Sequence, residues 1–225
     1  MTEETNLPSL DLYILDTETA GLHGGVCELA WLKVDSRMTV LEEFRALVNP
    51  ERPIEPAAQE IHGISDADVA DKPTLGELVV GKLEGPIAAC AHNLQFDLRM
   101  VKPHIQAHTR LCTLQMARKY IEGTTNHKLE TLQRELGLET RRSHTALDDC
   151  WTVRDLLIHI MGKTQVSLKT LIERHSKPNM LATMPYGKHK GKPMVQVPKD
   201  YREWLRSQAD LDPDMRFTLD KLATI

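Results

Sequence analysis

Residues 14–22, ILDTETAGL, place two carboxylates at the end of an apolar run that predicts a buried strand. Residues i and i+2 of a strand project to the same face, so Asp16 and Glu18 point into one space. Two carboxylates this close repel each other and are costly to desolvate unless a cation or a proton compensates. The pair taken alone also fits an exposed strand end with two solvated acids. The rest of the chain has to distinguish these two interpretations.

The surrounding segments predict an α/β fold in which helices flank a mixed sheet. Apolar runs at residues 10–16, 26–35 and 39–50 predict three strands in an antiparallel meander. Further strands are predicted at residues 86–91 and 110–113. Helices are predicted at residues 56–64, 74–84, 93–104, 114–120, 128–136 and from 144 onward, the last with Ser143 as its N-cap. Strands first, then strands alternating with helices, are typical of this architecture.

A change of composition after Gly162 divides the chain. We expect a main domain at residues 1–162, a linker with a short helical segment at 163–182, and a small C-terminal module at 183–225. Residues 1–162 hold 16 Lys and Arg against 25 Asp and Glu, whereas the remainder holds 12 against 7. The C-terminal region is therefore the part that could meet a polyanion.

The composition excludes several classes of protein. The hydrophobic content of 41% and the charged content of 27% are typical of a globular protein. No apolar run reaches the roughly 18 residues that a membrane span needs. The acidic, polar N-terminus predicts no secretory signal. The four cysteines (Cys27, Cys90, Cys112 and Cys150) form no CxxC pair, which favours buried thiols in a reducing compartment, so we expect a cytoplasmic protein.

Two further segments carry acidic residues. Asp97, in AHNLQFD, lies one turn into a predicted helix, where an acid could also serve only to complement the helix dipole. In SHTALDDC, His144 and Asp149 are five residues apart and converge if His144 lies in the entry loop or first turn. Asp148 competes with Asp149 for this role, and we interpret Asp148 as a solvated neighbour.

Four carboxylates from three separated segments, together with a histidine, form a coherent chemical set. Hard oxygen ligands suit Mg²⁺ or Mn²⁺. Two such ions can hold the attacking and leaving oxygens of a phosphodiester. A histidine can accept a proton from the attacking water at neutral pH. The sequence thus predicts that divalent metal compensates Asp16 and Glu18.

The motifs DTET, HNLQFD and HTALDD resemble the three motifs of the DEDDh branch of the DnaQ-like 3′–5′ exonuclease superfamily. The resemblance covers about residues 10–162, with all five signature residues in order; His144, rather than a tyrosine, separates this branch from the DEDDy branch. It implies an RNase H-like fold. It also implies a metal-dependent 3′–5′ exodeoxyribonuclease that hydrolyses the terminal phosphodiester to release nucleoside 5′-monophosphates, in DNA repair or processing.

The resemblance also implies roles for individual residues. Asp16 would bridge two Mg²⁺ ions, for which Mn²⁺ could substitute, and Glu18 and Asp149 would complete the site of the nucleophilic water. Asp97 would support the second ion, and His144 would be the general base. Substrate contacts are implied at Thr17, Thr19, Leu22, His62, His92, Asn93 and Phe96. A packing role for Leu22 or Phe96 is an equally supported alternative.

The basic tail carries a second resemblance. MPYGKHKGKP, residues 184–193, and the following VPKDYREWL resemble the C-terminal region of a bacterial exonuclease of the same superfamily. The lysines between the glycines are predicted to be exposed and to contact DNA; they are Lys188, Lys190 and, just beyond, Lys192. Tyr186, Tyr201 and Trp204 could stack on bases, but we expect them to form the core of a module too small to spare them.

Two other functions stay open at this level. An exoribonuclease would use the same five groups, because the chemistry is indifferent to the sugar and discrimination occurs at the 2′-OH. A non-catalytic nucleic-acid-binding module would have no use for four repelling acids. The resemblance of the tail favours DNA over RNA. We expect DNA as the partner, as a single strand or as the 3′ end of a duplex, and no membrane.

Overall fold

The structure is a computed structural model that describes residues 11–22, 24–80, 82–83, 87–102, 104–175, 178, 180–208 and 211–224. The chain forms two compact units, Met1–Arg174 and His175–Ile225. The first unit extends beyond Gly162 because helix α8 (Leu168–His175) contributes Leu168 and Leu171 to the main core. The expected linker at 163–182 thus begins with packed helix.

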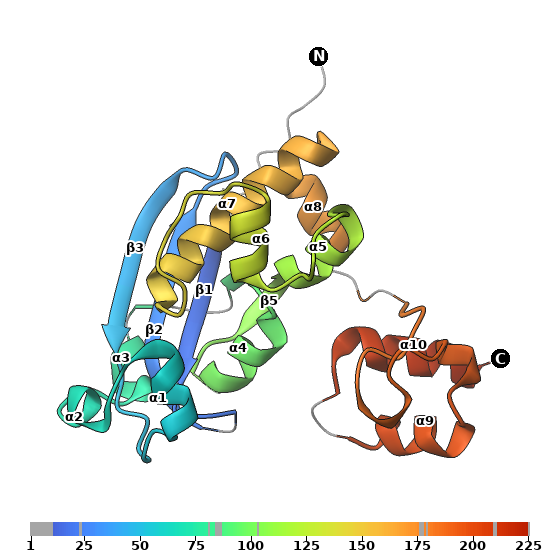
Figure 1. Cartoon of the computed structure of the whole chain (residues 1–225), viewed down its shortest axis with the longest axis horizontal. Coiled ribbons are helices and arrows are strands. Elements are labelled where there is room, and N and C mark those ends of the chain that lie inside the picture. Colours follow the sequence, from blue (N-terminus) through green and yellow to red (C-terminus); the bar gives the residue numbers. More distant parts are fainter. Residues whose placement is uncertain are drawn as a thin grey trace. The chain divides into compact units, whose positions relative to one another are not determined.

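The first unit is built on a five-stranded mixed sheet of order β3-β2-β1-β4-β5, which confirms the predicted sheet (Figure 1). The strands are β1 (Leu12–Thr19), β2 (Val26–Val34), β3 (Val40–Leu47), β4 (Ile87–Ala91) and β5 (Ala107–Cys112). The first three form the predicted antiparallel meander, whereas β4 runs parallel to both β1 and β5. The central strand β1 carries the DTET motif at its carboxyl end.

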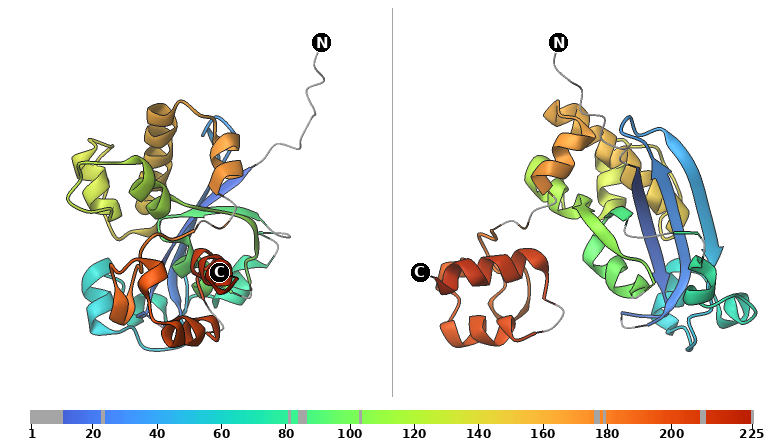
Figure 2. Two further views of the ribbon diagram at one scale, coloured as in Figure 1. Left: turned by 90° about the vertical axis from the view of Figure 1, so that its right-hand side faces the viewer. Right: turned by 180° about the vertical axis from the view of Figure 1, so that it is seen from behind.

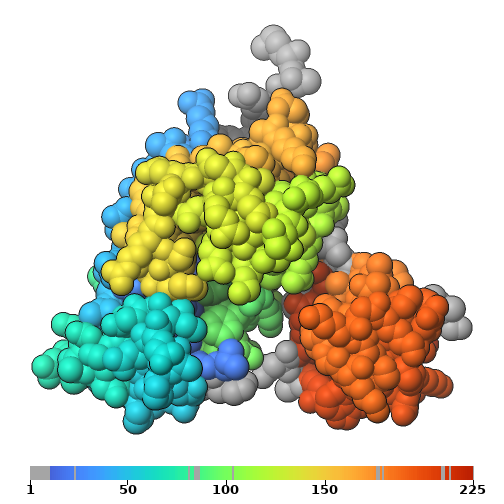
Figure 3. All heavy atoms as spheres, viewed as in Figure 1, coloured from blue at the N-terminus to red at the C-terminus, as the bar shows by residue number. Residues whose placement is uncertain are grey.

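Helices cover both faces of this sheet. They are α1 (Pro56–His62), α2 (Asp66–Val69), α3 (Leu75–Val79), α4 (Leu94–Val101), α5 (Thr113–Tyr120), α6 (Leu129–Glu135), α7 (Ala146–Thr164) and α8. Residues of α5 to α8 bury one face around Ile14 and Leu156, and residues of α3 and α4 bury the other around Leu15 and Trp31. Seen from behind, the strands lie in front of α7 (Figure 2). Side chains of α5, α6 and α7 form a continuous cover over one side (Figure 3).

Two helix predictions require correction. The helix expected at residues 74–84 ends at Val79, because Val80 adopts φ −57° and ψ 124°. Ser143 does not cap the long helix; α7 begins at Ala146 after Thr145, whose side chain makes no capping hydrogen bond. His144 therefore lies in the entry loop, with φ +63°.

Where the second unit is described, it forms the short 3₁₀ turns η1 (Gly187–His189) and η2 (Met194–Gln196) and the helices α9 (Lys199–Arg206) and α10 (Pro213–Ala223). Its core consists mainly of methionine and leucine side chains, such as Met184, Met215 and Leu219. Tyr201 packs against this core, but Tyr186 and Trp204 are 42% and 53% exposed. The expectation that all three aromatic side chains form the core is therefore wrong for these two.

Candidate active site

The acidic residues of the three motifs gather at one end of the sheet. Thr17, between Asp16 and Glu18 on β1, donates from its backbone N and its Oγ1 to Asp97 Oδ1, at 3.2 and 3.0 Å. One ligand atom from each of Glu18, His144 and Asp149 lies within 4.8 Å of the other two. The structure thus brings together the five residues that the motifs single out.

The topology explains this convergence. β1 and β4 are parallel neighbours, so their carboxyl ends lie at the same edge of the sheet. The chain leaves β4 through Asn93, whose left-handed conformation (φ 79°) starts α4 abruptly and places Asp97 within its first turn. Asp149 comes from the first turn of α7, which packs across β1 and β2.

A fifth carboxylate, which the sequence analysis missed, positions this helix. Glu28 on β2 is 1% exposed and pairs in register with Glu18, where two like charges destabilise the sheet. Its Oε1 accepts from Arg45 Nε at 2.6 Å, and its Oε2 accepts from Ala146 N, the first residue of α7, at 2.9 Å. Glu28 thus caps α7 from a distance, where a negative charge is favourable. Its only sequence signal was an acid inside the apolar run VCELAWL.

The entry loop of α7 selects Asp149 over Asp148. The backbone N of His144 donates to Asp149 Oδ2 at 3.1 Å. The imidazole is 47% exposed, with Nε2 3.9 Å from Glu130 Oε2. Asp148 approaches the cluster only as a like charge that raises the pKa of Asp149. Asp149 is thus the one of the two acids that lies with Glu18 and His144.

Burial raises the pKa of the four acids that the motifs supply, Asp16, Glu18, Asp97 and Asp149. The pKa of Glu18 rises to about 8, of Asp97 to about 7 and of Asp149 to about 6, with burial as the largest cause in each case. The pKa of Asp16 is raised well above its usual value by burial and then by four acidic neighbours, Asp97, Asp149, Glu18 and Glu28. A divalent cation would relieve these costs, and an all-carboxylate oxygen set suits Mg²⁺ or Mn²⁺. The carboxylate oxygens of these four acids therefore fit the divalent metal that the motifs imply.

We expect the metal-free protein to lose stability as the pH rises from about 6.5 to about 8.5. A carboxyl group whose pKa is raised on folding stabilises the folded state below its unfolded pKa, and this stability is lost as pH rises through the folded pKa. Glu18 and Asp97 titrate in this window. Buried His62 and His92 have lowered pKa values, and their opposing effect on stability ends near the lower limit of the window.

The measurement is the thermal midpoint across this range, in EDTA and in Mg²⁺. The midpoint should fall with pH in EDTA and stay nearly constant in Mg²⁺. Glu18→Gln, which removes the acid with the pKa of about 8, should flatten the EDTA profile. A midpoint that rises with pH in EDTA would contradict the electrostatic description of the site.

Several predicted substrate contacts are already engaged within the protein. Thr17 binds Asp97, and Thr19 Oγ1 donates to Gly21 O at 3.0 Å. His62 is 7% exposed; its Nδ1 accepts from Ile64 N, and its Nε2 lies 3.3 Å from Thr19 O. These contacts correspond to a neutral ring with the proton on Nε2. The two threonines and His62 thus support the end of β1, and their contact with substrate stays a prediction.

His92 also supports the site from behind. Its Nδ1 is 3.0 Å from Thr113 Oγ1, and its Nε2 is 2.9 Å from His127 O. Burial lowers the pKa of His92 to about 4, so the ring stays neutral. The exposed Asn93, beside it, makes no side-chain capping bond.

Leu22 and Phe96 lie at an accessible edge of the site. Leu22 is 73% exposed, which rules out a core role for it. Its carbonyl accepts from Arg99 Nη2 at 3.2 Å, and the Arg99 guanidinium lies over the half-buried Phe96 ring at 5.4 Å. An apolar side chain and a ring backed by a cation are therefore available to a ligand here.

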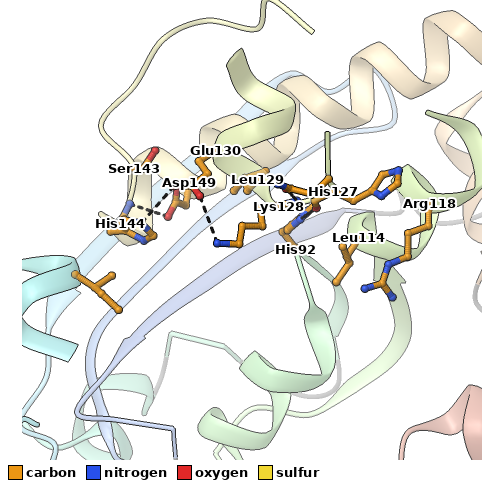
Figure 4. A pocket seen from close by; sticks show the side chains of 12 residues that line it. His92, Leu114, Arg118, His127, Lys128, Leu129, Glu130, Ser143, His144 and Asp149 are labelled. Carbon is orange, nitrogen blue, oxygen red and sulfur yellow. Dashed lines mark hydrogen bonds and ion pairs between the residues drawn. The ribbon is translucent and has the colours of Figure 1, made fainter. Parts of the chain in front are cut away.

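An open cavity of about 850 Å³ continues from the acidic cluster (Figure 4). His144 and Asp149 lie at one end and Arg118 at the other, with Lys128 between them. Lys128 is also 3.7 Å from Glu130. The sequence analysis did not single out Arg118 or Lys128, because isolated cations in a polar segment are usual on any surface.

The family model for the exonuclease family matches residues 13–157, the segment that carries all five clustered groups. The chain belongs to this exonuclease family. Among the described residues, Glu18, His144 and Asp149 form a group that could hold a metal ion. A second model, described as "Putative quorum-sensing-regulated virulence factor", matches residues 177–212.

The chain is similar to curated exonuclease-family proteins. It is 35% identical over 217 residues to Exodeoxyribonuclease 10 of Escherichia coli K12, covering 92% of this chain and 96% of that protein. This agrees with the resemblance of its C-terminal region to that of a bacterial exonuclease. It is 30% identical to the DNA polymerase III subunit epsilon of Pasteurella multocida, covering 66% of this chain and 67% of that protein.

Solved structures show the same fold. Exonuclease X in complex with 5′-overhanging duplex DNA matches with a TM-score of 0.63 and 33% identity, over 72% of this chain and 98% of that one. E. coli Exonuclease I in complex with a dT13 oligonucleotide matches with a TM-score of 0.60 at 17% identity, over 69% of this chain and 42% of that one, which supports the fold alone. Within the described residues, no helix is both long and apolar enough to cross a membrane.

Proposed function

We propose that the protein is a metal-dependent 3′–5′ exodeoxyribonuclease that releases nucleoside 5′-monophosphates from DNA in the cytoplasm, in DNA repair or processing. The carrying observation is the cluster of Asp16, Glu18, Asp97, Asp149 and His144 at one end of a cavity that also presents cations. The similarity to Exodeoxyribonuclease 10 supports DNA as the substrate.

Asp16, Glu18, Asp97 and Asp149 would hold two Mg²⁺ ions, for which Mn²⁺ could substitute. When bound, such ions stabilise the negative charge that develops on the attacking and leaving oxygens of a phosphodiester. Thr17 holds Asp97 in place through two hydrogen bonds. Glu28 fixes the start of α7 and therefore the position of Asp149.

His144 removes the proton from the attacking water in this proposal. Its backbone N is held by Asp149, while its side chain is 47% exposed and can reach a water at the cluster. A general base of this kind must lie within hydrogen-bond reach of the proton that it removes.

The cavity provides a path for the strand behind its 3′ end. Leu22, Asn93 and Phe96 would contact the terminal nucleotide, where apolar and aromatic groups suit a base. Lys128 and Arg118 line the cavity beyond the acids and would contact phosphates. In the second unit, the exposed Lys188, Lys190 and Lys192 are further candidate contacts to DNA.

The test uses a 5′-labelled strand as single-stranded DNA, as duplex DNA and as RNA, incubated in Mg²⁺ and in EDTA. A metal-dependent ladder that shortens from the 3′ end, faster on DNA than on RNA, is expected. A ladder mainly on RNA would keep the reaction and overturn the substrate. Binding without cleavage in Mg²⁺ and in Mn²⁺ would overturn the enzyme and favour a binding module.

A further inference from the structure

The second unit carries four aromatic side chains that are not fully buried: Tyr186 and Trp204 are exposed, and His189 and Tyr201 are half-buried. Tyr201 on α9 packs edge-on against His189, with ring centroids 4.7 Å apart and an interplanar angle of 80°. Tyr201 also lies 5.3 Å from Trp204, at 35°. Trp204 is 53% exposed, and Tyr186, the residue before the turn that begins at Gly187, is 42% exposed. We call His189, Tyr201, Trp204 and Tyr186 the aromatic row.

The aromatic row is built on a fixed scaffold. The backbone of the 187–192 turn is closed by hydrogen bonds from Lys190 N to Gly187 O and from Gly191 N to Met184 O, at 3.1 and 2.7 Å. Gly187 has φ +72°, and a Cβ there would approach the Tyr201 hydroxyl to 2.8 Å. The turn therefore needs glycine at this position to approach α9, and this approach sets His189 against Tyr201.

The same turn presents positive charge beside the row. Lys188, Lys190 and Lys192 alternate along it, and all three are exposed. Within the described part of the chain, none of them makes an ion pair. A polyanion could therefore engage the three ammonium groups without first breaking contacts within the protein.

We propose that the aromatic row and the three lysines form a second nucleic-acid site, which binds unpaired bases of single-stranded DNA. Aromatic faces stack on bases irrespective of sequence, and neighbouring cations neutralise the backbone phosphates. Paired bases in a duplex hide their faces, so the row selects single strands. The site rests on the proposed function only for the choice of DNA as the polyanion.

Tryptophan fluorescence gives a direct readout for this site. The chain has three tryptophans. Trp31 is 1% exposed, Trp151 is half-buried and Trp204 is 53% exposed, so Trp204 is the most exposed reporter. We would titrate the full chain, in EDTA to prevent cleavage, with an oligothymidylate of about 15 nucleotides. Emission should be quenched by the single strand and much less by a duplex of equal length.

Two variants test the two halves of the site. Trp204→Leu should abolish the quench and weaken binding by about 5- to 150-fold, the value of stacking one base. Replacing the three lysines by glutamine should weaken the salt dependence: the negative slope of log K against log salt should decrease in magnitude by about 2. Phe217→Leu, in which the half-buried ring on α10 lies outside the aromatic row, is the matched control and should bind as wild type does.

Equal binding by Trp204→Leu and wild type, measured by anisotropy of a labelled oligonucleotide, would overturn the proposal, as would equal affinity for duplex and single strand. Such a result would leave the nuclease assignment untouched if the protein still produces a 3′ ladder. Conversely, quenching by a chain that cleaves nothing would support this site and overturn the nuclease.

Discussion

Replacing Asp16 or Asp149 by asparagine should lower turnover by about 10³–10⁵-fold, because metal-ion stabilisation supplies several kcal/mol to the transition state. Asparagine keeps the shape of the side chain and removes the charge. Each aspartate is half-buried, and desolvation, followed by neighbouring like charges, raises its pKa. The variants should therefore unfold at a higher temperature than the wild type in EDTA at pH 8, while losing activity in Mg²⁺.

This combination of opposite effects is specific to the site. A substitution that merely damages the fold would lower both activity and the thermal midpoint. Asp148→Asn is the matched control, since Asp148 is adjacent in the same helix and, among the described residues, its carboxylate accepts no hydrogen bond from the cluster. It should keep activity within a fewfold of wild type. Full activity in either Asp16→Asn or Asp149→Asn would disprove the assignment.

The chemical core of the site could be predicted because each of its groups lies next to a local structural signal. Asp16 and Glu18 end an apolar strand, and Asp97 begins the helix after β4. Strand period and parallel pairing then bring the segments to one edge of the sheet. The predicted mixed sheet and meander are confirmed for the same reason, since apolar periodicity determines which residues form the strands.

The features that the sequence did not predict depend on contacts between distant segments of the chain. Ser143 looked like an N-cap, but Glu28, far away in sequence, supplies the acceptor for the first N–H of α7. The contacts of His62 and His92 with backbone carbonyls also join distant segments, and no local pattern reveals them; their role as substrate contacts stays a prediction. Trp204 looked like core because the module is small, whereas methionine and leucine fill that core instead.

His144→Ala should lower turnover by about 10²–10⁴-fold, the usual loss when a general base is removed. The geometry also allows the imidazole to act as a ligand, since one of its nitrogens lies within 4.8 Å of Glu18 and Asp149 ligand atoms. Varying the Mg²⁺ concentration separates these two roles. If His144 is the base, the rate deficit stays constant at every Mg²⁺ concentration, because the four acids still hold the metal.

The measurement is single-turnover cleavage of a 5′-labelled single strand over a range of Mg²⁺ concentrations. His108→Ala, which removes an exposed histidine on edge strand β5, is the control and should leave the rate unchanged. Recovery of the His144→Ala rate at high Mg²⁺ would overturn the base and make His144 a ligand. A deficit that persists, with DNA affinity unchanged, assigns proton removal to His144, since no other histidine lies within the Glu18, His144 and Asp149 group among the described residues.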